Sequence, residues 1–444
     1  MNIKLLIFII FTIIVVIFGM NRFKDKNNNF NIFLIFCAIL LNLYIRTDFE
    51  FGAKYWYIST VLILLFVIYI ALLIDNMKKI GNVKGFIKQI KIDNILLVII
   101  LISFIVSFKT KQVYNINSFL DMFFMYFSIL LIGLIYKHMK KFSYKYVLEL
   151  CTVLAAFNGC LSILQYVFNK KFLIGQFNDT LSYMQSGHIV KRSVGIAGTN
   201  NAAGVLGVIF FSVVLFCFLK NRSRKNLIAL ILTSIFSILT LTRTGYVAIA
   251  AEILCYVLFT DWKDKKIRKI KLWAFAGFAI TFTIIMFLFG EKIIFTLFTQ
   301  RGATASSRFV QYRFIFDKIL GFYPSWGGIG VGQYRDFVAV NFRTSSGKLW
   351  PYISIDVHSQ YLSLIVDSGW IVALLFLLFN VYLLYKAVKS CSGKLQRAFV
   401  ISLFVGNFMA SNFVPNQEYV INNWLYYLIM YCMVYKKNNK ELIN

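Results

Sequence analysis

The sequence predicts an all-α, polytopic integral membrane protein, and three observations lead to this prediction. Hydrophobic residues make up 59% of the 444 residues and charged residues only 15%, whereas soluble domains average about 45–50% and about 25%. Long apolar runs recur along the chain, and basic residues concentrate in alternate connections between them. A water-soluble domain is therefore excluded, and membrane orientation explains the net charge of +29 better than a nucleic-acid partner does.

The apolar runs define the expected membrane helices. Because a helix needs about 20 residues to cross the hydrocarbon core, we expect about 12–14 transmembrane helices. No small-residue cleavage site follows the first run, so it predicts a membrane helix rather than a signal peptide. The candidate spans are residues 3–19, 30–45, 57–74, 94–108, 118–136, 146–168, 202–219, 227–241, 246–260, 272–290, 359–385, 399–412 and 422–435.

The distribution of charge predicts which connections face the cytoplasm. Of the 47 Lys and Arg residues, 29 lie in seven connections on one side of the alternation, which the positive-inside rule makes cytoplasmic. The opposite side carries one large extracytoplasmic loop at about residues 291–357, in which we expect short helices. We divide the chain into N-terminal transmembrane helices (1–168), a region with the outer loop (169–385) and C-terminal transmembrane helices (386–444).

Within the outer loop, two patterns predict local structure. Apolar residues at helical spacing predict an amphipathic helix that lies on the membrane surface. Four nearby glycines loosely resemble a dinucleotide-binding loop, but no β-α-β unit surrounds them, so they predict a tight turn. The helical stripe is Phe309, Tyr312, Phe316, Ile319 and Leu320, and the glycines are Gly327, Gly328, Gly330 and Gly332.

Several kinds of chemistry lack a sequence signature. The chain has no phosphate-binding loop motif and no Asp-x-Asp pair, and it has only three histidines. The seven cysteines form no Cys-x-x-Cys pair, and six of them lie within apolar runs, so they predict buried thiols. We therefore expect neither a cofactor nor a metal site.

The outer connections are enriched in arginine, with eight among their 18 basic residues. A guanidinium fork binds phosphate or carboxylate through two parallel hydrogen bonds. Arg243 lies in the short TLTRTGY turn between two spans, at or below the membrane surface, where a charge is costly and marks function or a dedicated partner. Glu252 lies on the opposite helical face, so a bound anion such as a lipid diphosphate is the better partner.

Three further residues are candidates for a site on the outer side. Arg192 precedes a Gly/Asn-rich stretch at the start of a span, where backbone amides can bind anions. His358 begins the span after the large loop and is a candidate general base. Asp367 is nine residues further on and on the opposite face, so it needs another partner.

Four segments in order resemble the O-antigen ligase and polymerase (Wzy-like) family of membrane glycosyltransferases. They are RSVGIAGTNNAAG from Arg192, TRTG from Thr242, Ser307–Arg308 followed by GIGVGQY, and HSQYLSLIVDSG from His358. The chain departs from the family pattern in two places, because it has Ser359 where Asn is usual and Asp367 where Glu is usual.

The resemblance implies a polyprenyl (undecaprenyl) diphosphate-linked glycan as the substrate, delivered to the outer face of the bacterial cell membrane. It implies that Arg192, Arg243, Arg308 and, more weakly, Arg301 contact the diphosphate, and that His358 activates or positions the acceptor hydroxyl with Asp367 in support. It implies no cofactor and no nucleic acid, and it adds the lipid bilayer, a flippase and a chain-length regulator as partners.

Three functions remain open at the level of sequence. Richness in Lys, Asn, Ile and Phe suggests an AT-rich genome, as in many Gram-positive bacteria, and favours a GT-C-like polymerase of capsular or exopolysaccharide repeat units. A ligase that transfers a finished glycan to another acceptor has the same motifs. A flippase for lipid-linked sugars would place its charges near the membrane midplane rather than at the outer edge.

Overall fold

The computed structural model describes most of the chain from residue 95 to residue 436. The predicted spans 3–19 and 272–290, most of 30–45 and much of 57–74, together with Arg301, lie outside the described residues. The described ranges are 32–33, 35–37, 48–51, 54–57, 62–63, 65–70, 74, 95–139, 142–172, 180–185, 188–260, 269, 302–321, 327–343 and 353–436.

The predicted spans in the described part are helical, and the fold is that of an all-α polytopic membrane protein. Four of the described helices, α6, α7, α8 and α15, are long and apolar enough to cross a membrane, whereas α5 is shorter. The bundle helices are α5 (Ile95–Thr110), α6 (Ile116–His138), α7 (Tyr144–Phe168), α8 (Asn200–Lys220), α9 (Arg224–Leu239), α10 (Arg243–Phe259), α15 (Trp370–Ser390), α16 (Lys394–Ser411) and α17 (Val420–Tyr435).

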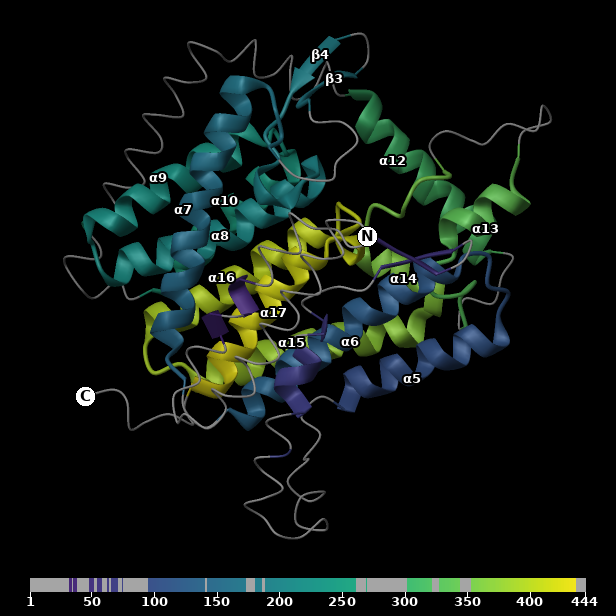
Figure 1. The fold of residues 1–444 in the computed structure, drawn as a ribbon, viewed down its shortest axis with the longest axis horizontal. Helices are drawn as coiled ribbons and strands as arrows, with labels where there is room; N and C mark the ends of the chain where they lie inside the picture. The colour runs from purple at the N-terminus through teal and green to yellow at the C-terminus, as the bar shows by residue number, and fades with distance from the viewer. Residues whose placement is uncertain are drawn as a thin grey trace.

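Figure 1 shows how these helices are arranged. Helices α7 to α10 form one group, α5, α6 and α15 form another, and α16 and α17 lie between the two. Helix α10 packs along α16, α7 along α9, and α17 against α6 and α15. Helix α8 is buried over most of its length and is apolar on all sides, as expected of a central helix.

Polar side chains fix where several helices begin. Asn115 accepts a hydrogen bond from the Asn117 N–H at the start of α6, and Ser143 and Ser223 cap α7 and α9 in the same way. Ser359 caps a short helix, α14 (Gln360–Ser368), by accepting from the Leu362 N–H. Each cap satisfies a backbone donor that has no partner within the helix.

The single span predicted at 359–385 is wrong, because the chain divides there into α14 and α15. Gly369 separates the two helices with φ of 88°, a conformation that disfavours other residues. The Val366 and Asp367 carbonyls accept from the N–H groups of Ile329 and Gly330 at 2.8 and 2.9 Å. Hydropathy alone merges the two helices because both are apolar.

The described part of the predicted outer loop forms a small separate core beside the bundle. It contains α12 (Gly302–Phe314), a π-helical turn η3 (Ile315–Leu320) and α13 (Tyr334–Asn341), and α14 packs against them (Figure 1). Two residues of the predicted apolar stripe, Phe309 and Phe316, are 72% and 52% exposed. The rest of the stripe packs onto protein: Ile319 is buried together with Gln311 and Ile315, and Tyr312 and Leu320 pack against this small core.

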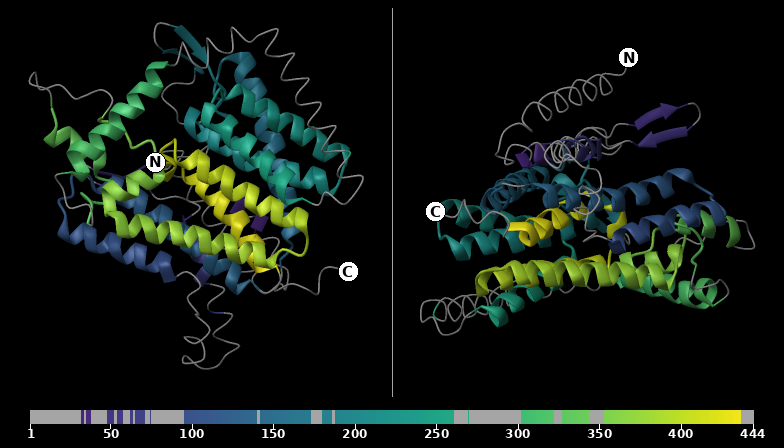
Figure 2. Two further views of the ribbon diagram at one scale, coloured as in Figure 1. Left: turned by 180° about the vertical axis from the view of Figure 1, so that it is seen from behind. Right: turned by 90° about the horizontal axis from the view of Figure 1, so that it is seen from below.

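Short elements complete the described structure, and Figure 2 shows them from two further directions. Two small antiparallel hairpins add to the predicted helical architecture, with Asp48 paired to Tyr57 in one and Ser182 to Lys191 in the other. The second hairpin leads directly into Arg192. The elements are β1 (Asp48–Phe51), β2 (Lys54–Tyr57), β3 (Ser182–Gln185), β4 (His188–Lys191), η1 (Gly195–Ala197) and η4 (Asn416–Glu418).

Candidate functional site

His358 lies in the segment that enters α14, with its ring held in one tautomer. Its Nδ1 is 2.9 Å from the Asp356 carbonyl oxygen. A carbonyl can only accept, so Nδ1 carries the proton and Nε2 keeps its lone pair. Burial lowers the pKa of His358 below its ordinary value, and the positive charge of Arg308 lowers it further. The imidazole is therefore poised as a neutral base.

Helix α12 fixes the backbone of His358. The Tyr312 hydroxyl donates to the His358 carbonyl at 2.7 Å, and the His358 N–H donates to Gln311 Oε1 at 3.3 Å. Gln311 is fully buried, and its Nε2 also donates to the Ile355 carbonyl at 2.8 Å. Because Arg308 is one turn earlier on the same helix, α12 couples the position of the base to that of a cation.

Three of the predicted arginines act electrostatically on one another, and one of them, Arg308, also acts on His358. Burial lowers the pKa of Arg308, and the charges of Arg243 and Arg192 act in the same direction, partly offset by Tyr312 and Tyr419. Among the described residues, the charged groups that act on Arg308 are thus two arginines and no carboxylate. Its Nε is buried and has no hydrogen-bond partner among the described residues. Such a cluster attracts an anion.

Arg192 holds the turn that carries Arg243. Its Nε donates to the Thr240 carbonyl at 2.6 Å, Nη2 to the Thr242 hydroxyl at 2.7 Å and Nη1 to the Tyr183 hydroxyl at 3.3 Å. Arg192 is only 3% exposed. Much of its hydrogen-bonding capacity is therefore used to fix the junction of α9 and α10, next to Arg243.

A polar stripe on α7 supports the segment that follows Arg192. Gln165 Oε1 accepts from the Gly195 N–H at 2.7 Å and from the Val194 N–H at 3.2 Å, and Asn158 Oδ1 accepts from the Ile196 N–H at 2.7 Å. This segment is buried among helices, where every backbone donor needs a partner.

Our sequence reasoning missed this stripe, although a signal was present. Asn158, Ser162 and Gln165 lie at i, i+4 and i+7 in an otherwise apolar helix, which places them on one face. The residues that fix His358 from α12 were also missed, because Gln311 and Tyr312 act on the backbone of a segment far along the chain.

Asp367 supports the glycine turn rather than contacting His358. Its Oδ2 accepts from the Ser363 hydroxyl at 3.2 Å. Burial raises the pKa of Asp367 to about 7, and the Ser363 hydroxyl and the backbone N–H groups of Gly332 and Tyr334 oppose the shift. The glycines form the tight turn predicted from sequence: Gly328 has φ of +64°, and a Cβ there would lie 2.3 Å from the Asp367 carbonyl oxygen.

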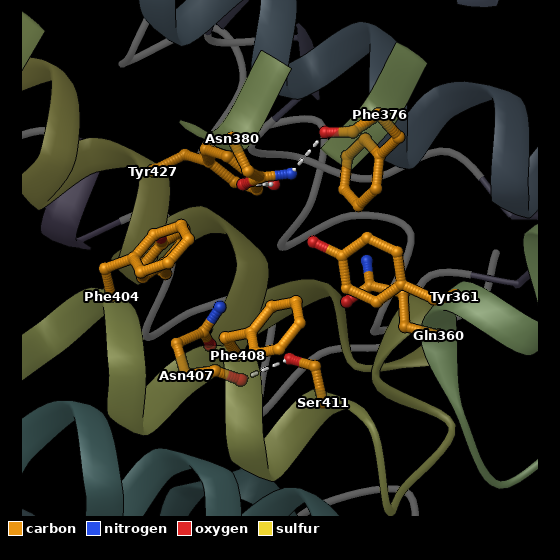
Figure 3. Close-up of a pocket in the computed structure, with 10 residues that line it drawn as sticks. Gln360, Tyr361, Phe376, Asn380, Phe404, Asn407, Phe408, Ser411 and Tyr427 are labelled. Carbon is orange, nitrogen blue, oxygen red and sulfur yellow. Dashed lines mark hydrogen bonds between the residues drawn. The ribbon is translucent and has the colours of Figure 1, made fainter. Parts of the chain in front are cut away.

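A small cavity lies beneath α14, between α15, α16 and α17 (Figure 3). It measures about 10 Å³, which is room for about one water molecule. Gln360 Nε2 and Asn407 Oδ1 line it and have no hydrogen-bond partner among the described residues. A sugar ring cannot fit there, so the arginine cluster rather than this cavity is the candidate substrate site.

The described residues form no group of three His, Cys, Asp or Glu side chains that could hold a metal ion. The described ion pair on α12 joins Arg313 Nε to Asp317 Oδ2 at 3.3 Å, and both side chains are well exposed. Arg313 lies on the same helix as Arg308 but outside the arginine cluster, so it is a suitable control for experiments on Arg308.

Comparison with known proteins finds one family match, which covers part of this site. Residues 228–377 match the family model described as O-Antigen ligase, a segment that includes Arg243, Arg308, His358 and Asp367 but not Arg192. No curated protein matches the chain. The match confirms the resemblance to the O-antigen ligase and Wzy-like family, and it indicates a membrane glycosyltransferase-like enzyme that acts on lipid-linked glycans.

Proposed function

Because residues 228–377 match the O-antigen ligase family, we propose that the protein polymerises polyprenyl-diphosphate-linked oligosaccharide repeat units. The reaction takes place at the outer face of the bacterial cytoplasmic membrane, and its product is a capsular polysaccharide or exopolysaccharide. The observation that carries the proposal is the cluster of Arg192, Arg243 and Arg308 beside a neutral His358.

The reaction follows from the chemistry of these groups. The acceptor hydroxyl oxygen forms a bond to the anomeric carbon of the donor glycan, and the bond from that carbon to the diphosphate oxygen breaks. His358 Nε2 takes the hydroxyl proton, since Nδ1–H is held by the Asp356 carbonyl. The polyprenyl diphosphate leaves with the electron pair of the broken bond.

The arginines stabilise the charge that develops on the leaving diphosphate. Arg308 supplies a partly buried guanidinium whose buried Nε has no hydrogen-bond partner among the described residues, and Arg243 supplies a further positive charge. Arg192 adds charge and fixes the turn of Arg243 through Thr240 and Thr242. Asp367 orders the glycine turn, and Arg301 remains a weaker candidate for the diphosphate.

Ligation is the second candidate, and the family description itself favours it. It uses the same bond changes but moves a finished glycan to a different acceptor. Reconstituted protein given only lipid-linked repeat units separates the two. A ladder of lengthening lipid-linked chains supports the polymerase, whereas chain transfer that requires a second acceptor supports the ligase.

A matched pair on α12 tests the site. Arg308→Ala removes a cation of the cluster and should lower the polymerisation rate by about 10²–10³-fold, the usual loss when one stabilising donor is removed. Arg313→Ala removes an exposed arginine paired with Asp317, five residues away, and should leave the rate within about twofold.

Both variants should remain in the membrane at wild-type levels, and repeat units on the lipid carrier should remain single in Arg308→Ala. His358→Ala should give the same single-unit product. A normal ladder from Arg308→Ala and His358→Ala would refute the site. Translocation of lipid-linked units without polymer formation would favour a flippase instead.

A further inference from the structure

The end of the bundle opposite the arginine cluster carries a second, unrelated group of cations. Lys220 at the end of α8 donates to the Tyr144 hydroxyl at 2.9 Å, and Gln396 Nε2 donates to the same hydroxyl at 3.2 Å. Lys436, just after α17, donates to Gln396 Oε1. These four residues come from the ends of four different helices.

Both ammonium groups approach one aromatic ring. Lys220 Nζ is 4.9 Å and Lys436 Nζ is 5.5 Å from the centroid of the Tyr144 ring. A cation over a tyrosine ring gains about 0.5–1 kcal/mol at an exposed site. Two like charges around the same ring also repel each other, so the arrangement needs negative charge nearby.

Within the described part of the chain no carboxylate forms an ion pair with either lysine, although Glu149 of α7 and Lys220 both act electrostatically on Cys217. The groups that act electrostatically on Lys436 are Cys391, Tyr144 and Cys432. Lys436 is only 8% exposed. Buried charges in proteins are normally paired, and an anion bound here would pair this ammonium.

We propose that Lys220 and Lys436 bind the phosphate of an anionic phospholipid in the leaflet at this end of the bundle. Lysine is a compact point charge suited to phosphate. The surrounding connections, 137–145, 220–226 and 386–398, are rich in basic residues, and such segments concentrate anionic lipids at a membrane surface. Tyr144 begins α7 and Lys220 ends α8, and both helices are long enough to cross a membrane. We therefore expect these two residues at the level of the lipid headgroups.

The full-length protein in a neutral detergent tests this site by native mass spectrometry. The protein is titrated with short-chain phosphatidylglycerol, with phosphatidylcholine of the same chain length, and with inorganic phosphate. We expect specific retention of phosphatidylglycerol. Lys220→Gln and Lys436→Gln should each weaken it by about fivefold, the effect typical of one basic residue near an anionic surface.

Lys225→Gln is the matched control, because Lys225 is an exposed lysine in the same connection, at the start of α9. Its affinity for phosphatidylglycerol should stay within about twofold of wild type, since a single exposed lysine contributes little to a defined site. Lys220 is itself exposed, so Lys220→Gln keeps the test valid if Lys436→Gln does not fold. Lys436→Arg should retain binding.

Equal loss in Lys225→Gln and Lys220→Gln would overturn the proposal, because it would indicate attraction to the whole basic surface. Unchanged retention in Lys220→Gln would also overturn it. Displacement of phosphatidylglycerol by millimolar inorganic phosphate would assign the site to a soluble anion instead. Because the site is at the end of the bundle opposite His358, these outcomes do not depend on polymerisation.

Discussion

Replacing Tyr312 by phenylalanine tests whether α12 positions the histidine. The change removes one hydroxyl that donates to the His358 carbonyl at 2.7 Å and leaves the ring in the small core of α12, α13 and α14. A hydrogen bond of this kind contributes about 0.5–1.5 kcal/mol, and leaving a partly buried carbonyl unpaired can raise the cost to about 2 kcal/mol. Since 1.36 kcal/mol is a factor of ten in rate, we expect kcat to fall by about 3–30-fold.

The effect should appear in kcat rather than KM. Tyr312 holds the backbone of His358, and it has no proposed role in binding the diphosphate. The assay is the initial rate of chain extension by reconstituted protein as a function of lipid-linked repeat-unit concentration. Tyr256→Phe is the matched control, since the Tyr256 hydroxyl donates to the Ser212 carbonyl at 3.0 Å near the end of α10 that is remote from Arg243.

Tyr256→Phe should lower the thermal stability about as much as Tyr312→Phe, but it should leave kcat within about twofold, because it loses a comparable hydrogen bond away from the base. Equal kcat values in Tyr312→Phe and Tyr256→Phe would refute the positioning role. A higher KM with unchanged kcat in Tyr312→Phe would refute it as well.

Three further predictions concern the base, the glycine turn and the stripe on α7. The rate should rise with pH through a midpoint below about 6.5, the ordinary histidine pKa, because burial and Arg308 lower the pKa of His358 and only its neutral form accepts a proton; a midpoint above that value in a pH–rate profile contradicts this. Gly328→Ala should destabilise the protein by at least about 2 kcal/mol, from positive φ and overlap with a carbonyl. Gly327→Ala, whose Cβ would meet only a lysine ammonium at 3.5 Å, should unfold near the wild-type temperature. Gln165→Leu should cost about 2–4 kcal/mol by leaving backbone donors unpaired, and an unchanged melting temperature would exclude this role.

The sequence predicted the helices well because a membrane span must satisfy its own backbone and be apolar over a fixed length. It also singled out Arg192, Arg243, Arg308 and His358, because a charge next to an apolar span is costly enough to need a reason. In the structure the three arginines act electrostatically on one another and Arg308 acts on His358, although the four residues come from four separate stretches of chain.

The supporting residues could not be predicted in the same way. Tyr312 and Gln311 belong to a helix whose apolar residues occupy more than one face, and only the position of the His358 backbone decides which face packs inward. The break at Gly369 is equally hidden, because a hydropathy window averages across one glycine. The polar stripe of α7 was readable, since its spacing is that of one helical face.

The break between α14 and α15 has a consequence for biosynthesis. A helix that stops leaves its last carbonyls without partners, and at α14 two of them are taken by the N–H groups of Ile329 and Gly330. These donors are synthesised before α14, so they have no partner until the later helix has emerged from the ribosome. We therefore expect the glycine turn and α14 to fold together, and His358, which lies between them in sequence, to become ordered in the same step.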